Sequence, residues 1–177
     1  MLRDRLAIGA LGVALFATPA RAQGLGSFEA AVLVRGTLFD PSLTRETAIG
    51  WGGRAGVYLA PAWLVEADLS TSNADGLASF TRATYRPFHA RVNFLAPYSD
   101  RGKAVFGLGV VATHYGGDFG KNDAGLAGLF GLCLDLHHSI VGRADFTLDF
   151  VPSPANQAGN NFIAGVQVGL GYRFGRQ

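Results

Sequence analysis

The sequence predicts an all-β protein: an eight-stranded antiparallel up-and-down transmembrane β-barrel with a polar lumen, preceded by a cleaved signal peptide. Three observations predict this fold. The chain begins with a secretory leader, it contains eight strand-length segments that alternate charged and apolar positions, and it has very few lysines.

Residues 1–22 have the features of a Sec-type signal peptide. Two arginines precede an uninterrupted run of apolar residues and glycine from Leu6 to Phe16, and Ala20–Ala22 (Ala-Arg-Ala) is a small-x-small cleavage site. The apolar run is too short to span a bilayer. We expect cleavage after Ala22 and one barrel domain at 23–177.

Removal of the leader changes the charge of the chain. The leader holds three of the 15 basic residues and one of the 13 acidic residues, so twelve of each remain. The basic balance of the whole sequence therefore gives no indication of nucleic-acid binding. The only lysines are Lys103 and Lys121, both predicted in connections, whereas a soluble surface is normally rich in lysine and glutamate. The single cysteine, Cys133, cannot form an internal disulfide, and we interpret it as a small residue packed in the lumen.

Eight segments have the composition and about the length of tilted membrane strands, roughly 9–11 residues each. No later segment has the ~18 consecutive apolar residues of a membrane helix. The nearest candidate, Ala124–Leu134, contains three glycines that favour a strand. The predicted strands are 28–38, 48–59, 63–72, 87–96, 104–115, 124–136, 141–150 and 161–174.

All charged residues of these segments share one parity, and therefore one face of each strand. In chain order they are Glu29 and Arg35 in the first segment, Arg54 in the second, Glu66 and Asp68 in the third, Arg91 in the fourth, Asp135 in the sixth, Arg143, Asp145 and Asp149 in the seventh, and Arg173 in the eighth. The fifth segment has Gly107 and Gly109 on this face. The opposite face is almost purely apolar, which a soluble sheet would also show.

Three features place the charged face inside the barrel. Small neighbours suit a narrow eight-stranded lumen, and the charged parity carries Gly50, Gly52, Gly56, Gly165, Gly169 and Gly171. Aromatic residues stand near the ends of the apolar faces, where interfacial girdles are expected: Phe28, Trp63, Phe94, Phe150, Phe162, Tyr172 and Phe174. The charged face also holds six acids and five arginines, which can pair, whereas the same groups facing lipid would cost several kcal/mol each.

We therefore interpret these eleven residues as a structural charge network in the lumen. His89 and Asn93 share the face and are predicted to extend the hydrogen bonding. Eight strands leave a lumen that side chains can fill, so the network argues against an open pore.

The connections alternate in length, as they do in outer-membrane barrels. Short turns are predicted near 59–62 and 136–139 and a modest one near 96–102, with mostly longer loops near 39–47, 73–86, 116–123 and 151–160. An even strand count returns both termini to the rim with the short turns, which is the periplasmic one. The stretch 77–86 is compatible with either a loop or an extension of the fourth strand.

Three stretches carry a family resemblance: Gly52–Pro61 (GGRAGVYLAP), Leu64–Leu69 (LVEADL) and the closing strand Gly165–Phe174 (GVQVGLGYRF). Through them nearly the whole chain after the leader resembles the eight-stranded outer-membrane barrels related to the N-terminal domain of outer membrane protein A. The resemblance implies the outer membrane of a Gram-negative-type bacterium, contact with its lipid and lipopolysaccharide, and a monomer.

In that family a closing strand that ends in an aromatic residue is the recognition signal for the barrel-assembly machinery. Phe174, with Tyr172, matches that role, although three residues follow Phe174. The peptidoglycan-binding domain of longer relatives is absent from this sequence, so we infer no cell-wall anchoring.

Short motifs that suggest catalysis or cofactors have local explanations. Gly107–Ala112 fits a dinucleotide fingerprint but lacks the following helix, and Asp118–Gly120 spells the kinase metal-binding triplet without other kinase motifs. His137 and Ser139 have the His-x-Ser spacing of lipid A deacylases, but Ile140 and Val141 replace the family's Asn-Ala, and the pair is predicted at the periplasmic turn. His137 and His138 alone make a poor metal site.

The leading hypothesis is a structural or surface-interaction barrel of the outer membrane, with any recognition carried by the extracellular loops. A narrow ion-leak pore is the main alternative, and a lipid A-modifying enzyme is a further one. A soluble barrel of lipocalin type, with an apolar lumen and polar exterior, is the fourth. We predict no catalytic, cofactor or metal site.

Overall fold

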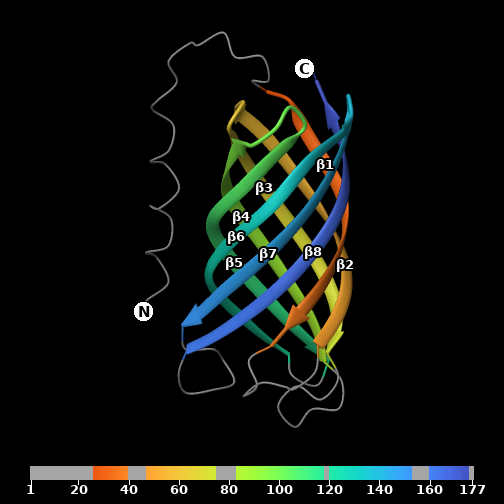
Figure 1. The fold of residues 1–177 in the computed structure, drawn as a ribbon. Helices are drawn as coiled ribbons and strands as arrows, with labels where there is room; N and C mark the ends of the chain where they lie inside the picture. The colour runs from red at the N-terminus through yellow and green to blue at the C-terminus, as the bar shows by residue number, and fades with distance from the viewer. Residues whose placement is uncertain (1–25, 40–46, 75–82, 118–119, 153–159, 176–177) are drawn as a thin grey trace.

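Eight antiparallel strands close into one barrel in the computed structural model, which describes residues 26–39, 47–74, 83–117, 120–152 and 160–175 (Figure 1). Each strand pairs with its neighbours in the chain, and the last pairs with the first. The strands are β1 (Phe28–Leu38), β2 (Thr47–Ala60), β3 (Trp63–Ala74), β4 (Ala83–Pro97), β5 (Gly102–Gly117), β6 (Lys121–His137), β7 (Ile140–Pro152) and β8 (Asn160–Phe174).

All eight predicted strands are confirmed, and the differences lie at their ends. β4 begins at Ala83, four residues before the prediction, so the end of the ambiguous stretch 77–86 is strand; residues 75–82 lie outside the described part of the chain. β5 and β6 also extend further, which reduces the predicted loop 116–123 to the connection 118–120. The ladder continues because Tyr115 pairs with Tyr85 on one side and Lys121 on the other.

Closure between β1 and β8 brings both ends of the barrel chain to one rim. Phe28 pairs with Phe174 at one end and Leu38 with Ala164 at the other. The start of β1 and the end of β8 therefore meet at the same rim. The short turns 61–62, 98–101 and 138–139 join strands at this rim too.

The strand residues alternate between a buried inner face and an exposed outer face. In β7, for example, Arg143, Asp145, Thr147 and Asp149 point inward, and Phe146 and Leu148 between them point outward. Among the described residues no helix is long and apolar enough to cross a membrane. The predicted leader, 1–22, lies outside the described residues.

Candidate functional site

The charged lumen is the candidate functional site. Nine of the eleven charged residues expected there are buried, namely Glu29, Arg35, Arg54, Glu66, Asp68, Arg91, Arg143, Asp145 and Asp149. The other two, Asp135 and Arg173, lie near the rim that carries the termini, and their side chains are 27% and 12% exposed.

Glu66 is the centre of this network. Its carboxylate accepts hydrogen bonds from Arg143 at 2.6 and 3.3 Å and from Arg91 at 3.4 Å. Arg54 approaches the same carboxylate at 3.8 Å, so three guanidinium groups surround one acid. Asp145 lies beside this cluster and accepts from Arg143 at 2.7 Å and from Arg54 at 3.2 Å.

His89 links the cluster around Glu66 to Asp149 and Arg35, which lie further from the rim with the termini. Its ring lies between two carboxylates, with Nδ1 2.9 Å from Asp68 and Nε2 3.0 Å from Asp149. Asp68 also accepts a hydrogen bond from Arg91, and Asp149 accepts one from Arg35 at 3.1 Å. The predicted extension of the network through His89 is therefore present in the structure.

A third cluster carries the network to the rim with the termini. Glu29 accepts hydrogen bonds from the Tyr58 hydroxyl at 2.7 Å and from Arg173 at 3.4 Å. Arg173 lies with its guanidinium 5.0 Å from the Tyr58 ring centre and 3.2 Å from Asp135. Lys103 also pairs with Asp135, at 3.3 Å.

These contacts join all eleven predicted residues into one network, because Arg54 also approaches Glu29 at 3.6 Å. Six carboxylates face five arginines and Lys103, so the fixed charges balance. An ion pair taken out of water offsets its desolvation cost only when its geometry is good and its remaining donors and acceptors are bonded. The network meets the first condition through its many ion pairs and the second only in part. Four of its arginines each keep a buried nitrogen without a hydrogen bond in the described residues: Arg35, Arg54, Arg91 and Arg173.

Three members of the network were not predicted: Lys103, Tyr58 and Gln167. Lys103 was expected in a connection but is the second residue of β5, where it reaches the lumen mouth. Gln167 donates to Asp145 at 3.2 Å. All three share the parity of the inward-facing residues of their strands, so their face could be read from the sequence. Asn93 was predicted to extend the hydrogen bonding, and that prediction is wrong. Its side chain is buried in the lumen, but its amide forms no hydrogen bond with the described residues.

Apolar and aromatic side chains fill the rest of the lumen, beyond the network at one end and beside it at the other. Towards the rim opposite the termini, Tyr85 packs against Phe39 and Tyr115 with ring centres 5.1 and 5.6 Å apart, and all three are buried. Towards the rim with the termini, one buried cluster contains Val105, Leu129, Cys133 and Val141, and another contains Tyr58, Leu64 and Leu95. Cys133 thus packs in the lumen, as its parity predicts.

Glycine makes room for the network at points of close approach. A Cβ built on Gly131 of β6 would overlap the Asp145 carboxylate and the carbonyl of Ala144. A Cβ on Gly109 of β5 would likewise overlap the backbone of Ala90 and Arg91. The glycines on the charged parity are therefore part of how a narrow barrel accommodates large ionic side chains.

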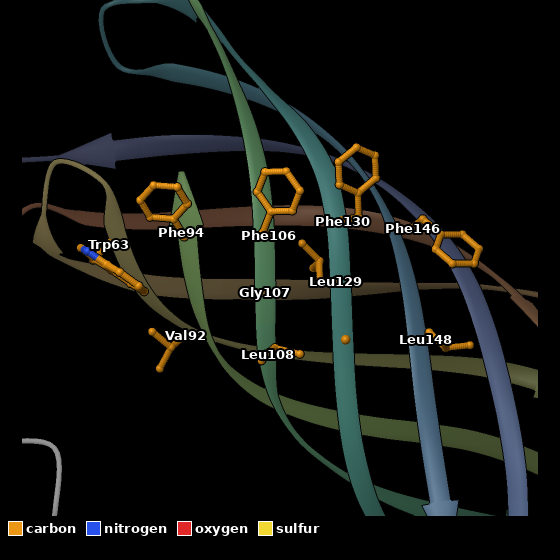
Figure 2. Close-up of a pocket in the computed structure, with 11 residues that line it drawn as sticks. Trp63, Val92, Phe94, Phe106, Gly107, Leu108, Leu129, Phe130, Phe146 and Leu148 are labelled. Atoms are coloured by element: carbon orange, nitrogen blue, oxygen red, sulfur yellow. The ribbon is translucent and has the colours of Figure 1, made fainter. Parts of the chain in front are cut away.

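The outer face of the barrel is a continuous apolar surface. An oblique row of aromatic residues crosses five strands, each residue paired directly with the next: Trp63, Phe94, Phe106, Phe130 and Phe146 (Figure 2). The row lines a shallow hollow of about 630 Å³, together with neighbouring residues such as Leu108, Gly128 and Leu148. Further ring pairs stand at both rims, Phe28 with Phe174 at one and Phe150 with Phe162 at the other.

The motifs that suggested chemistry lie in ordinary structural positions. Gly107–Ala112 is an internal part of β5. His137 ends β6 and Ser139 lies in the following turn; no hydrogen bond joins their side chains in the described residues. The His137 and His138 rings contact each other, 4.9 Å apart. No group of three or more potential metal ligands occurs within the described residues, and residues 118–119 of the kinase-like triplet lie outside them.

No family model matches this sequence, and no curated protein matches it either. Solved structures do. Neisserial surface protein A superposes with a TM-score of 0.64 at 15% identity, covering 84% of this chain and 96% of that one. The outer membrane protein OprG from Pseudomonas aeruginosa gives 0.59 at 14%, covering 87% and 98%.

This is the fold of the small outer-membrane β-barrels. The N-terminal β-barrel domain of Pseudomonas aeruginosa OprF is a further match, with a TM-score of 0.54 at 14% identity over 85% of this chain and all of that domain. At such identities the likeness shows the fold alone. The apolar exterior and charged lumen agree with it, and they are the reverse of the lipocalin-type barrel that was the soluble alternative.

Proposed function

We propose that this protein is an integral outer-membrane barrel of structural or surface-interaction type whose lumen is closed to ions. One observation carries the proposal. The eleven buried or half-buried charges form a single connected network, and apolar and aromatic side chains fill the lumen around it and beyond its outer end. Ions cross a barrel through a continuous polar path, and this lumen is occupied by paired side chains instead.

The orientation follows from the strand connections. We assign the rim with the short turns and both barrel ends to the periplasm, and the opposite rim to the outside of the cell. Recognition of a surface partner is assigned to the connections at the outer rim, most of whose residues (40–46, 75–82, 118–119 and 153–159) lie outside the described part of the chain. The similarity to outer-membrane barrels supports this location.

The closer relationship to the N-terminal domain of outer membrane protein A is part of the proposal, carried by the sequence motifs above. So are a monomeric state, contact with lipid and lipopolysaccharide, and insertion by the barrel-assembly machinery. Tyr172 and Phe174 suit the role of assembly signal because they end β8 with their rings exposed and 4.7 Å apart.

No catalytic role is assigned. His137 and Ser139 lie at the rim that we place in the periplasm, away from the outer leaflet where lipid A resides. Release of fatty acid from lipid A by the purified protein, lost in Ser139→Ala, would instead support an enzyme.

Planar-bilayer recording tests the closed lumen. We expect the purified, heat-modifiable protein to produce no steady conductance at any moderate voltage, while an open porin in the same bilayer conducts. A steady conductance whose ion selectivity changes in Glu66→Gln or Arg143→Gln would overturn the proposal in favour of the ion-leak pore. The same change in the exposed turn residue Asp100→Asn serves as the control, because Asp100 lies outside the lumen network.

A further inference from the structure

A long apolar groove of about 770 Å³ crosses the outer face of the barrel from β6 to β2. Its floor is formed where β7 carries its two smallest outward residues, Gly142 and Ala144. Leu134 and Leu136 of β6 form one side, and Trp51 of β2 marks the far end. The groove spans four interstrand spacings of about 4.8 Å, or about 19 Å. That length suits an acyl chain filling half of a hydrocarbon core about 30 Å thick.

A second, polar hollow of about 400 Å³ lies at the rim with the termini. Arg101, Asp135, His137 and His138 line it, together with Arg173 and Leu136. Leu136 lines the apolar groove as well, so the two hollows are adjacent at this residue. An apolar groove with a polar hollow beside one end matches an amphiphile, which has an apolar chain and a polar head group.

The polar hollow contains basic side chains that form no ion pair with its carboxylate. Its one carboxylate, Asp135, is already paired with Lys103 at 3.3 Å and with Arg173 at 3.2 Å. Arg101 is exposed and forms no ion pair with the described residues. His137 and His138 are exposed too, and their rings contact only each other within the same part of the chain. These three side chains offer N–H donors, and Arg101 a fixed positive charge, to an anion.

We propose that the groove and the rim hollow together bind one anionic glycerophospholipid of the periplasmic leaflet. Its phosphate lies against Arg101, His137 and His138, and one acyl chain lies along Gly142 and Ala144. The site rests on the proposed function, because it exists only if this face of the barrel is immersed in a bilayer. Phosphatidylglycerol has the required chemistry: one net negative charge and two acyl chains.

The two tryptophans of the chain provide a built-in probe, because Trp51 lines the groove and Trp63 does not. In Trp63→Phe the remaining fluorescence comes from Trp51 alone. We compare vesicles that contain phosphatidylglycerol brominated in the distal half of its chains with vesicles that contain equally brominated phosphatidylcholine. A single basic side chain near an anionic surface favours the anionic lipid by about fivefold, and we expect quenching of Trp51 to report that enrichment.

Matched variants separate the two halves of the site. Arg101→Gln/His137→Gln/His138→Gln, all in exposed positions, is expected to bring quenching by the two lipids to equality. Ala144→Phe fills the floor of the groove and is expected to reduce quenching by both lipids. Ala112→Phe makes the same change at an exposed outer position of β5 that does not line the groove, and it is expected to leave quenching unchanged. The reciprocal reporter, Trp51→Phe, reads Trp63 and is expected to show no lipid preference.

Equal quenching by the two lipids in the Trp63→Phe protein overturns the lipid site but leaves the membrane barrel intact. Weak quenching by both, together with a cross-linked pair of chains in the vesicles, shows that a second copy covers the groove and also overturns it. Protein that shows no quenching by any brominated lipid and no heat-modifiable migration has not inserted, and that result contradicts the proposed function itself.

Discussion

The inner and outer faces of the same eight strands reverse the usual distribution of polar and apolar residues. On the inner face, residues that are normally exposed are hidden: Arg35, His89 and Asp149 have at most 1% of their surface accessible. On the outer face, residues that normally form a core are exposed: Leu108 and Ile49 are accessible over 77% and 75% of their surface. Alternation alone would look the same in a soluble barrel with the faces exchanged.

The difference shows which interactions each face requires. A charge inside must have its partners within reach, because no bulk water replaces them. A side chain on the outer face needs no specific partner, because the hydrocarbon of the membrane surrounds it as a solvent. That face must therefore be apolar, with aromatic residues at the rims, but it needs no precise fit to a neighbour. The inner face should therefore be sensitive to partner identity, and the outer face to polarity alone.

The largest effect is expected from removing the acid at the centre of the lumen. Glu66→Ala leaves the guanidinium groups of Arg54, Arg91 and Arg143 without their shared carboxylate. Removing one partner of a buried ionic group costs about 3–5 kcal/mol, and we expect a loss of that size in the free energy of unfolding, measured by guanidinium titration in lipid vesicles. Asp100→Ala, in an exposed turn, is the control and should change the free energy little.

The double variant Glu66→Ala/Arg143→Ala tests whether pairing is the cause. It removes one charge of each sign, so it should be less destabilised than the sum of its single variants. If the two losses add fully, the contact between Glu66 and Arg143 contributes nothing, and the inner face does not depend on partner identity.

The faces themselves could be predicted from the sequence, but the pairings inside could not. Parity assigns Glu66, Arg143 and Asp145 to the lumen because strand residues alternate regularly, and that rule needs no tertiary information. Which carboxylate meets which arginine depends on the stagger of β1 against β8 and on the tilt of the strands. Arg54 and Asp145, for example, lie 91 residues apart and meet across the lumen.

The errors at strand ends have the same origin. Gly116, Gly117 and Asn122 are turn-forming residues, so the sequence predicts a loop near 116–123, yet the β5–β6 ladder continues and leaves only 118–120 between the strands. Pairing with a neighbour that already has its register overrides local turn preference. Asn93 likewise has the correct face but no hydrogen-bond partner in the described residues, because parity gives a direction and not a contact.

A charge on the outer face is expected to have the next largest effect. Leu108→Arg places a guanidinium in the middle of the outer apolar surface, and arginine at the midplane of a transmembrane barrel costs about 2–4 kcal/mol. The loss should be measurable in the same vesicle titration. Tyr98→Arg, at an exposed turn of the rim with the termini, should cost about 0–1 kcal/mol. Equal effects at the two positions would show that this face does not lie in hydrocarbon.

Glycine substitutions compare the two faces on one strand. Gly131→Ala puts a methyl group where the Asp145 carboxylate lies, and overpacking of this kind typically costs about 1–3 kcal/mol. Gly128→Ala, three residues earlier in β6, points outward and would meet its nearest atom, the Leu148 carbonyl oxygen, at an ordinary 3.6 Å. Gly128→Ala should therefore be neutral or slightly stabilising in the same unfolding measurement. A loss in Gly128→Ala as large as in Gly131→Ala would mean that strand propensity, and not the lumen network, explains both.

The smallest effect on stability is expected at the seam where the barrel closes. Phe174 contacts Phe28 at 5.9 Å between ring centres, and an aromatic pair contributes about 0.5–1.5 kcal/mol beyond its buried area. Phe174→Leu keeps an apolar side chain on the outer face and removes the ring, so it should lower the free energy of unfolding by about that amount. Phe162→Leu removes a ring from the pair with Phe150 at the opposite rim, 5.1 Å apart, and should cost a similar amount. The two variants should differ in assembly: if Phe174 is the signal for the barrel-assembly machinery, only Phe174→Leu slows machinery-dependent insertion into proteoliposomes. Equal insertion rates would leave Phe174 as one more aromatic residue of the rim, with a role in stability alone.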